Sequence, residues 1–152
     1  MYSDITYITS QGVAGEQSLA NLADKVNKPG DITDAATIAN IEGAIARADG
    51  VIDSYLRAVY SGDLPLASPP ETVRNVSAEI AVYYLWESTN VSHDDNPRAS
   101  AYDDALRWLR DIAAGKAVLD LPGGETNPAA GCESNGRYAD RQFSPVTLRG
   151  RF

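Results

Sequence analysis

Hydrophobic positions recur every three or four residues along several stretches of the chain, and this spacing predicts helices. The clearest stretch runs from 34 to 60, where one face consists of Ile38, Ile41, Ile45, Ala48, Ile52, Tyr55 and Val59. Thr33 or Asp34 stands at its start and is suited to cap the first free N–H groups. Gly43 and Gly50 lie inside it, and two glycines in one helix indicate either close approach by a neighbour or a strained, kinked helix.

Three other stretches complete a predicted helical bundle. A short, weakly amphipathic helix is expected at 16–24, and a longer one at 70–88 has an apolar stripe of Val73, Val76, Ile80 and Tyr83 or Tyr84. The last helix is expected from Pro97 to Gly115, with Tyr102, Ala105, Leu109 and Ile112 repeating correctly and Leu106, Trp108 and Ala113 widening the stripe. So broad a stripe predicts neighbours on more than one side.

After Gly115 the helical pattern stops. Residues 117–122 (AVLDLP) predict a short strand, and 122–136 are rich in Gly, Pro and Asn, which predicts a mobile loop. The last nine residues alternate between Ser144, Val146, Leu148, Gly150 and Phe152 on one side and Pro145, Thr147, Arg149 and Arg151 on the other. Pro145 removes one ladder bond, so an edge strand laid on a surface is expected. The predicted fold class is therefore mainly α: a small helical bundle (1–115) followed by a loop and a long extended C-terminal arm (116–152) carrying short β segments.

Charge divides the chain in the same way. The 152 residues carry a net charge of −8. Residues 1–115 hold eight basic and seventeen acidic residues, a net charge of −9, whereas 137–152 hold four arginines and one aspartate, a net charge of +3. The body is expected to repel nucleic-acid phosphates, which argues against a nucleic-acid-binding regulator, and the tail is expected to prefer an acidic surface.

Cysteine content and the N-terminal sequence indicate the compartment. The single cysteine, Cys132, allows no internal disulfide, so an oxidising compartment is not implied. The start of the chain lacks the basic and apolar regions of a signal peptide, and no apolar run approaches the ~20 residues that span a bilayer. We expect a soluble, cytosolic protein that does not act on membranes.

One cluster offers candidate catalytic chemistry. His93, Asp94 and Asp95 are the only histidine–acid group, and such residues ligate divalent metals, so a small metal-dependent hydrolase is one hypothesis. The simpler interpretation is that Asp94 and Asp95 interact with free N–H groups at the start of the following helix. Asp49 and Asp53, one turn apart, suggest either an acid–base pair or a solvated helix face.

The remaining candidate sites are weaker. Residues 24–34 have the composition of a calcium loop, but Val26 and Lys28 occupy ligand positions. Tyr83, Tyr84 and Trp86 have no basic residues among them, so they are expected in the core or at an interface before they are expected to stack on bases. No nucleophile elbow, dinucleotide fingerprint or P-loop is present, so we predict that the protein is not an enzyme and uses no cofactor and no metal.

Four segments in order resemble one known family. They are AIARADGVIDSYLRAVYSGDLPLASPP (44–70), EIAVYYLWE (79–87), AYDDALRWLRDIAAGKAVLDLP (101–122) and FSPVTLRGRF (143–152). Together they resemble the head–tail connector, or neck adaptor, proteins of Mu-like phages. The loop at 24–34 departs from relatives with a more Asp- and Gly-rich version, which argues against a metal there.

The resemblance implies a virion protein of the phage neck that is made and assembled in the host cytoplasm. It implies a helical protomer that forms a ring, twelvefold in the expected case, beneath the portal protein, with a stopper, another neck protein or a tail protein on the far side. Genomic DNA would pass through the channel without specific binding. The C-terminal tail would reach the portal, and the residues expected to bind it are Phe143, Ser144, Val146, Leu148, Arg149, Gly150 and Phe152. The alternative for the tail is a disordered end, which is compatible with ordering on binding.

Overall fold

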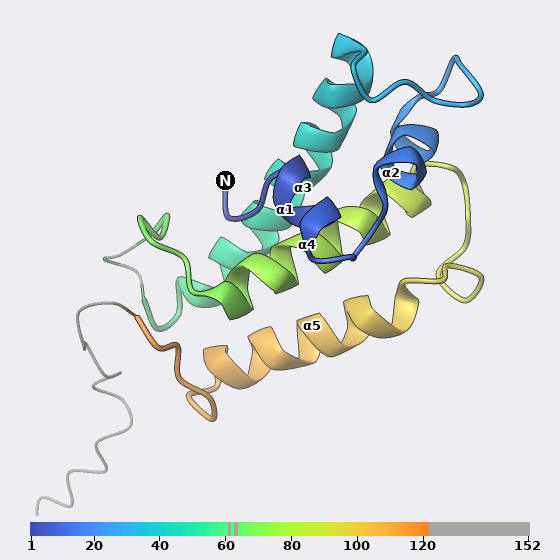
Figure 1. The fold of residues 1–152 in the computed structure, drawn as a ribbon. Helices are drawn as coiled ribbons and strands as arrows, with labels where there is room; N and C mark the ends of the chain where they lie inside the picture. The colour runs from blue at the N-terminus through green and yellow to red at the C-terminus, as the bar shows by residue number, and fades with distance from the viewer. Residues whose placement is uncertain (61, 63, 122–152) are drawn as a thin grey trace, which may run out of the picture.

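A computed structural model describes residues 1–60, 62 and 64–121 of the chain. Its helices are α1 (Ile5–Ser10), α2 (Glu16–Ala23), α3 (Ala35–Leu56), α4 (Glu71–Glu87) and α5 (Ala99–Ala113), as Figure 1 shows. Over these residues there is no strand. The predicted mainly helical fold is confirmed, whereas most of the predicted arm, including its terminal strand, lies outside the described residues.

Helix α4 is the centre of the bundle. It contacts all four other helices, and in Figure 1 it lies between α3 and the antiparallel α5, with α1 across it. Its buried residues are Val73, Ser77, Ala78, Ile80, Ala81, Val82, Tyr83, Tyr84 and Leu85. A single stripe was expected from the periodicity, but the C-terminal half is buried almost all round. The sequence carries the signal, because residues 80–86 are all uncharged and apolar.

Helix α3 follows its predicted periodicity with two differences. Asp34 is the cap, and its Oδ2 accepts hydrogen bonds from Ala36 N and Thr37 N, both at 3.1 Å. The buried face consists of Thr37, Ile41, Ile45, Ala48, Ile52 and Leu56. Ile38 and Tyr55 lie at its margins and are half-buried. The helix ends at Leu56 rather than at residue 60. Val59 N and Tyr60 N both bond to the Leu56 carbonyl, at 3.0 and 2.8 Å, and the bond from Val59 has the three-residue spacing of a tighter turn.

Among the described residues, the two glycines of α3 have no close neighbour. A Cβ built on Gly43 or on Gly50 meets nothing within 4 Å. Close packing within the part of the chain that the structure describes therefore does not account for them. Gly30 is different, because a Cβ there would overlap the backbone carbonyl of Ala20, where the 24–34 loop touches α2.

We expect Gly43→Ala and Gly50→Ala each to raise the free energy of unfolding by about 0.5–1 kcal/mol, because alanine costs less backbone entropy in a helix and meets no obstacle here. Urea unfolding of the purified variants measures the change. Gly30→Ala is the contrasting variant and should be destabilising. Loss of stability in both helix variants would contradict the open surface seen around α3.

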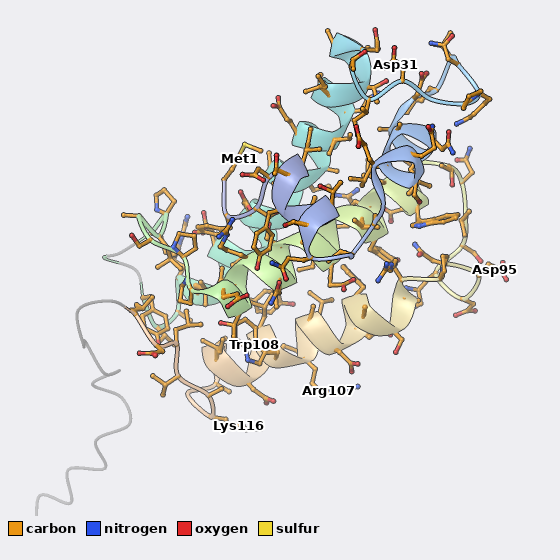
Figure 2. The ribbon with its side chains drawn as sticks, viewed as in Figure 1. Met1, Asp31, Asp95, Arg107, Trp108 and Lys116 are labelled. Atoms are coloured by element: carbon orange, nitrogen blue, oxygen red, sulfur yellow. The ribbon has the colours of Figure 1, made fainter. Side chains whose placement is uncertain are left out.

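Helix α5 uses its broad stripe inside the protomer. It contacts both α4 and α3, burying Ala105, Leu109 and Ile112, while Leu106 and Trp108 are half-buried. In Figure 2, Trp108 lies on the side of α5 that faces α4, and Arg107 projects from the opposite side. The prediction of neighbours on more than one side is confirmed, with both neighbours in the same chain.

The short helix α1 was not expected. Asp4 caps it, with Oδ1 accepting from Tyr7 N at 2.6 Å, and Tyr7 and Ile8 are buried. Six residues are too few for a 3.6-residue period to show, so the capping aspartate before an apolar pair was the available signal. Tyr7 also donates from its hydroxyl to Asn75 Oδ1 at 2.8 Å, which joins α1 to α4.

The strand predicted at 117–122 is wrong over the described part, 117–121. Lys116 N and Ala117 N bond back to the Asp111 carbonyl at 2.8 and 3.2 Å, and Leu119 N donates to the Tyr60 hydroxyl at 3.0 Å. These partners replace those that a neighbouring strand would supply. Leu119 is buried in the core, so the base of the arm is held against the helices.

None of the described helices combines the length and the apolar character that crossing a membrane requires.

Candidate functional site

The residues expected to bind the portal, Phe143, Ser144, Val146, Leu148, Arg149, Gly150 and Phe152, lie outside the described residues. Their role stays a prediction. What the structure places is the body from which they extend, with three polar clusters and one hollow that bear on function.

The first cluster, here the N-terminal network, joins the start of the chain to α3 and α4. Tyr2 N donates to Asp49 Oδ2 at 2.9 Å, and the Tyr2 hydroxyl donates to Asp53 and accepts from Leu66 N at 3.2 Å. Ser77 Oγ donates to Asp49 Oδ1 at 2.8 Å and shares a hydrogen bond with Ser3 Oγ at the same distance. Tyr2 and Ser3 are both buried. The network therefore ties residues 2–3 and the 62–70 loop to the bundle.

This network corrects both interpretations of Asp49 and Asp53. The side chain of Asp49 is 14% exposed and meets backbone and hydroxyl donors, so the two carboxylates do not form a solvated helix face. Nor do they form an acid–base pair, since each is bound by a different group of Tyr2. Burial, with the Asp53 carboxylate beside it, raises the pKa of the Tyr2 hydroxyl above its ordinary value. Both carboxylates are hydrogen-bond acceptors for Tyr2.

The second cluster contains His93. Its Nδ1 lies 2.9 Å from the Tyr83 hydroxyl and its Nε2 lies 3.3 Å from Asp103 Oδ2. Asp95 accepts a hydrogen bond from Ser92 Oγ at 2.7 Å, and Asp94 is exposed. Figure 2 shows Asp95 at the edge of the loop between α4 and α5. The side chains of His93, Asp94 and Asp95 do not meet at one point where they could share a ligand. Both ring nitrogens of His93 already have partners, Tyr83 and Asp103.

A metal centre is therefore not assembled from these residues. Across residues 1–60, 62 and 64–121, no group of three or more His, Cys, Asp or Glu side chains is placed to hold a metal ion. The hypothesis of a metal-dependent hydrolase rests on His93, Asp94 and Asp95 alone, and the structure gives it no geometric support. The expectation that the carboxylates assist a helix start is not met either, because Arg98 occupies the cap position and no side chain caps α5.

Aromatic rings fill the space between α4 and α5. The rings of Tyr83 and Tyr102 stack at 3.9 Å with an interplanar angle of 11°, and Tyr84 meets Tyr102 edge to face. Arg47 lies over the Tyr84 ring at 3.7 Å and pairs with Glu87 at 2.8 Å. Burial and the bond to Tyr102 raise the pKa of Tyr84 to about 12. Tyr83 and Tyr84 are core residues, as expected, and offer no free ring faces for nucleic-acid bases.

The third cluster organises the loop at 24–34. Asp24 Oδ1 accepts from Val26 N and Asn27 N, both at 2.8 Å, and its Oδ2 accepts from Asp31 N at 3.3 Å. Asn21 Oδ1 accepts from Gly30 N at 2.8 Å, which joins the loop to α2. The carboxylate that a calcium loop would offer to an ion is instead occupied by backbone N–H groups. These bonds, from Asn27 first and then Val26, lower the pKa of Asp24 to about 2.

We expect the Asp24 carboxylate to contribute stability that is lost in acid. Because its folded pKa is depressed, the contribution is complete above the ordinary aspartate pKa of ~3.9 and disappears as the pH falls towards 2. Asp24→Ala should lower the melting temperature at pH 7 and lose less further stability between pH 4 and 2 than the parent chain. Asp24→Asn, which keeps one acceptor, should be intermediate, and Asp94→Ala at an exposed position should match the parent. If the stability of Asp24→Ala fell with pH in parallel with that of the parent chain, this assignment would be contradicted.

One hollow, here the α2 hollow, opens beside this loop. It has a volume of about 590 Å³ and is lined by Glu16, Gln17, Ala20, Pro29, Gly30, Asp31 and Ile32. Glu16 and Asp31 are exposed carboxylates at its edge, while Ala20, Pro29 and Ile32 supply apolar wall. Asp31 can be found in Figure 2 beside the start of α3. No sequence motif predicted this hollow, because it forms only when the loop folds back onto α2.

Comparison with known proteins places the chain among phage proteins. The family model described as "Bacteriophage Mu, Gp36" matches residues 7–136. The protein named "Gene product J" of Escherichia phage Mu is 32% identical over 108 residues, which cover 71% of this chain and 70% of that protein.

Proposed function

The chain belongs to the bacteriophage Mu Gp36 family, and from this premise we propose that it is a structural protein of the phage particle, a head–tail connector. In this proposal it forms a ring between the portal protein and a downstream neck or tail protein. The observation that carries the proposal is the family match over most of the chain. It is supported by a compact helical body in which the three polar clusters serve structure rather than catalysis.

The C-terminal tail is the proposed contact with the portal. It combines two arginines, Arg149 and Arg151, with an alternation of apolar residues that ends in Leu148 and Phe152, and two further arginines precede it at 137 and 141. Such a segment binds by strand addition, in which main-chain hydrogen bonds give affinity and pockets receive alternate side chains. The base of the arm supports this role, because Leu119 is held by Tyr60 and by the core, so the arm leaves the body from a defined point.

Copies of the protein are proposed to meet through heterologous contacts, one face of a subunit against a different face of the next. The outer face of α3 supports such a contact, since none of the residues that the structure describes lies within 4 Å of a Cβ at Gly43 or Gly50. The net charge of −9 over residues 1–115 favours a channel wall that repels DNA, so the genome can slide through without specific binding. Twelve copies remain the expected number.

Deletion of residues 143–152 tests the tail contact. The truncated protein should keep the helical circular dichroism and melting temperature of the full chain, because buried residues between Tyr2 and Leu119 already form a continuous core. Its co-sedimentation with portal-bearing heads should fall at least tenfold. The pair Leu148→Asp and Phe152→Asp should lose binding in the full chain, while Arg107→Ala on the outer face of α5 is the matched control. Undiminished binding by the truncated protein would sink the tail assignment.

A further inference from the structure

The basic tail and the acidic body of this chain are covalently joined, so the tail is always present at high effective concentration near the body. Residues 122–142 connect the last described residue, Leu121, to the tail. Their 21 residues reach up to ~70 Å when extended. A compact body of this size has a diameter of roughly 35 Å. The tail of one molecule therefore reaches every part of its own surface, including Asp31, which Figure 2 places far from Lys116.

The α2 hollow has the chemistry that an arginine side chain requires. Glu16 and Asp31 supply two carboxylates at its edge, and Ala20, Pro29 and Ile32 supply apolar wall for the aliphatic stem. Both bonds from Thr33 to Asp31 go to Oδ1, at 2.8 Å from the backbone N and 2.7 Å from the hydroxyl, and among the described residues no hydrogen bond involves Oδ2.

The nearest lysine of the loop does not compete for these carboxylates. Lys28 Nζ bonds to the carbonyl oxygens of Asn21 and Asp24, at 2.9 Å for the latter, and Lys28 is not among the residues that line the hollow. The bonds from Thr33 hold the pKa of Asp31 below its ordinary value, so this carboxylate stays ionised at neutral pH.

A second group of exposed acidic residues on the body is largely partnered. It lies around the start of α5 and contains Asp94, Asp95, Asp103 and Asp104. Asp103 faces His93 at 3.3 Å, Asp104 pairs with Arg107 at 2.7 Å, and Asp95 binds Ser92. Of these two acidic groups, the one at the α2 hollow lies beside a depression with apolar walls.

We propose that in the free protein residues 146–152 of the same molecule occupy the α2 hollow, with Arg149 and Arg151 facing Glu16 and Asp31. The segment VTLRGRF suits this surface because its arginines alternate with apolar residues. The contact would keep the tail from binding other acidic surfaces before assembly and would be exchanged for the partner surface afterwards. The contact itself is a property of the free protein; only its later exchange for a partner surface rests on the portal contact proposed above.

Paramagnetic relaxation on the full-length chain tests the proposal. A nitroxide at Thr147→Cys, in a Cys132→Ser background, should broaden the backbone amide signals of Gln17, Gly30 and Ile32 in an isotope-labelled sample. Raising the salt to 0.5 M should remove most of the broadening, because the contact is charged and exposed.

Charge-neutral variants locate the contact on the body. The double variant Glu16→Gln, Asp31→Asn should remove the broadening at low salt, and its new side-chain amide at position 31 keeps an oxygen acceptor for Thr33, so the loop is retained. Glu42→Gln with Asp104→Asn removes the same charge elsewhere and should leave the broadening intact.

Three outcomes would overturn the proposal. One is broadening centred on Asp94 and Asp103, and another is no selective broadening anywhere. The third is broadening seen only when isotope-labelled chains are mixed with separate spin-labelled chains, which would assign the contact to a second copy. Amide spectra of each variant confirm that the fold is kept. A negative result in the relaxation experiment would not change the expected head-binding result of the tail deletion. The two proposals can therefore be refuted separately.

Discussion

Tyr2→Ala is expected to lower the free energy of unfolding by about 3–5 kcal/mol, the range for removing a buried aromatic side chain. Tyr2 is 4% exposed, and its backbone and hydroxyl bind groups from α3 and from the 62–70 loop. Its removal leaves a cavity and takes one partner from Asp53 and from Leu66 N. Because the affected segment includes the approach to α1, amide exchange should also speed up in residues 5–10. Urea unfolding with hydrogen exchange measures both effects.

Tyr2→Phe separates the ring from the hydroxyl. It keeps the packing and should cost about 1.5–3 kcal/mol, the range for a lost hydrogen bond to a charged group. The pKa of Tyr2 is raised in the folded state, so its contribution is complete below the ordinary tyrosine pKa of ~10 and is lost as the pH rises further. The phenylalanine variant should therefore lose less stability than the parent above pH 10. If Tyr2→Ala and Tyr2→Phe lowered the free energy of unfolding equally, packing of the Tyr2 ring would contribute nothing, which would contradict its burial.

Ile80→Ala is the second change with a large expected effect, about 3–5 kcal/mol of destabilisation. Ile80 is fully buried at the middle of α4, the helix that contacts all others, so the cavity has walls from several elements and closes poorly. Thermal and urea unfolding provide the measurement. The cooperativity of the transition should be kept, because one core serves the whole body.

Ile38→Ala is the matched control for Ile80→Ala. The same sequence pattern predicted both isoleucines on buried stripes, but Ile38 is only half-buried at the margin of α3. Its replacement should cost about 1 kcal/mol, since part of the side chain already meets water and alanine favours the helix. A cost for Ile38→Ala equal to that for Ile80→Ala would show that α3 is rotated relative to the arrangement in Figure 1.

The central position of α4 shows where periodicity falls short. The pattern at 70–88 located the helix correctly, and a stripe through Val73, Ile80 and Tyr83 is buried. The same pattern did not predict the burial of Ala78, Ala81 and Val82, because small apolar residues occur on exposed helix faces as well as on buried ones. Burial on several sides depends on which helices arrive, and those contacts join residues far apart in the sequence.

The polar clusters were the least predictable feature. His93, Asp94 and Asp95 are adjacent in sequence, yet His93 turns to Tyr83 and Asp103. Asp49 lies 47 residues from Tyr2 in the chain, and its hydrogen bond to that residue had no local signal. A short-range pattern predicts caps such as Asp34 because donor and acceptor lie within three residues of each other. It cannot predict a pairing that requires the chain to fold back first.

By itself the sequence determined the helical class, the positions of the four longer helices, the cap of α3 and the contrast between an acidic body and a basic tail, because each depends on neighbouring residues or on composition. The tertiary structure alone decided that α4 is central, that Asp49 and Asp53 hold Tyr2, and that the 24–34 loop folds onto α2 to form a hollow. The physical reason is that the burial of a residue and its hydrogen-bond partners depend on the three-dimensional arrangement of the chain. They arise when segments distant in the chain meet and water is excluded between them.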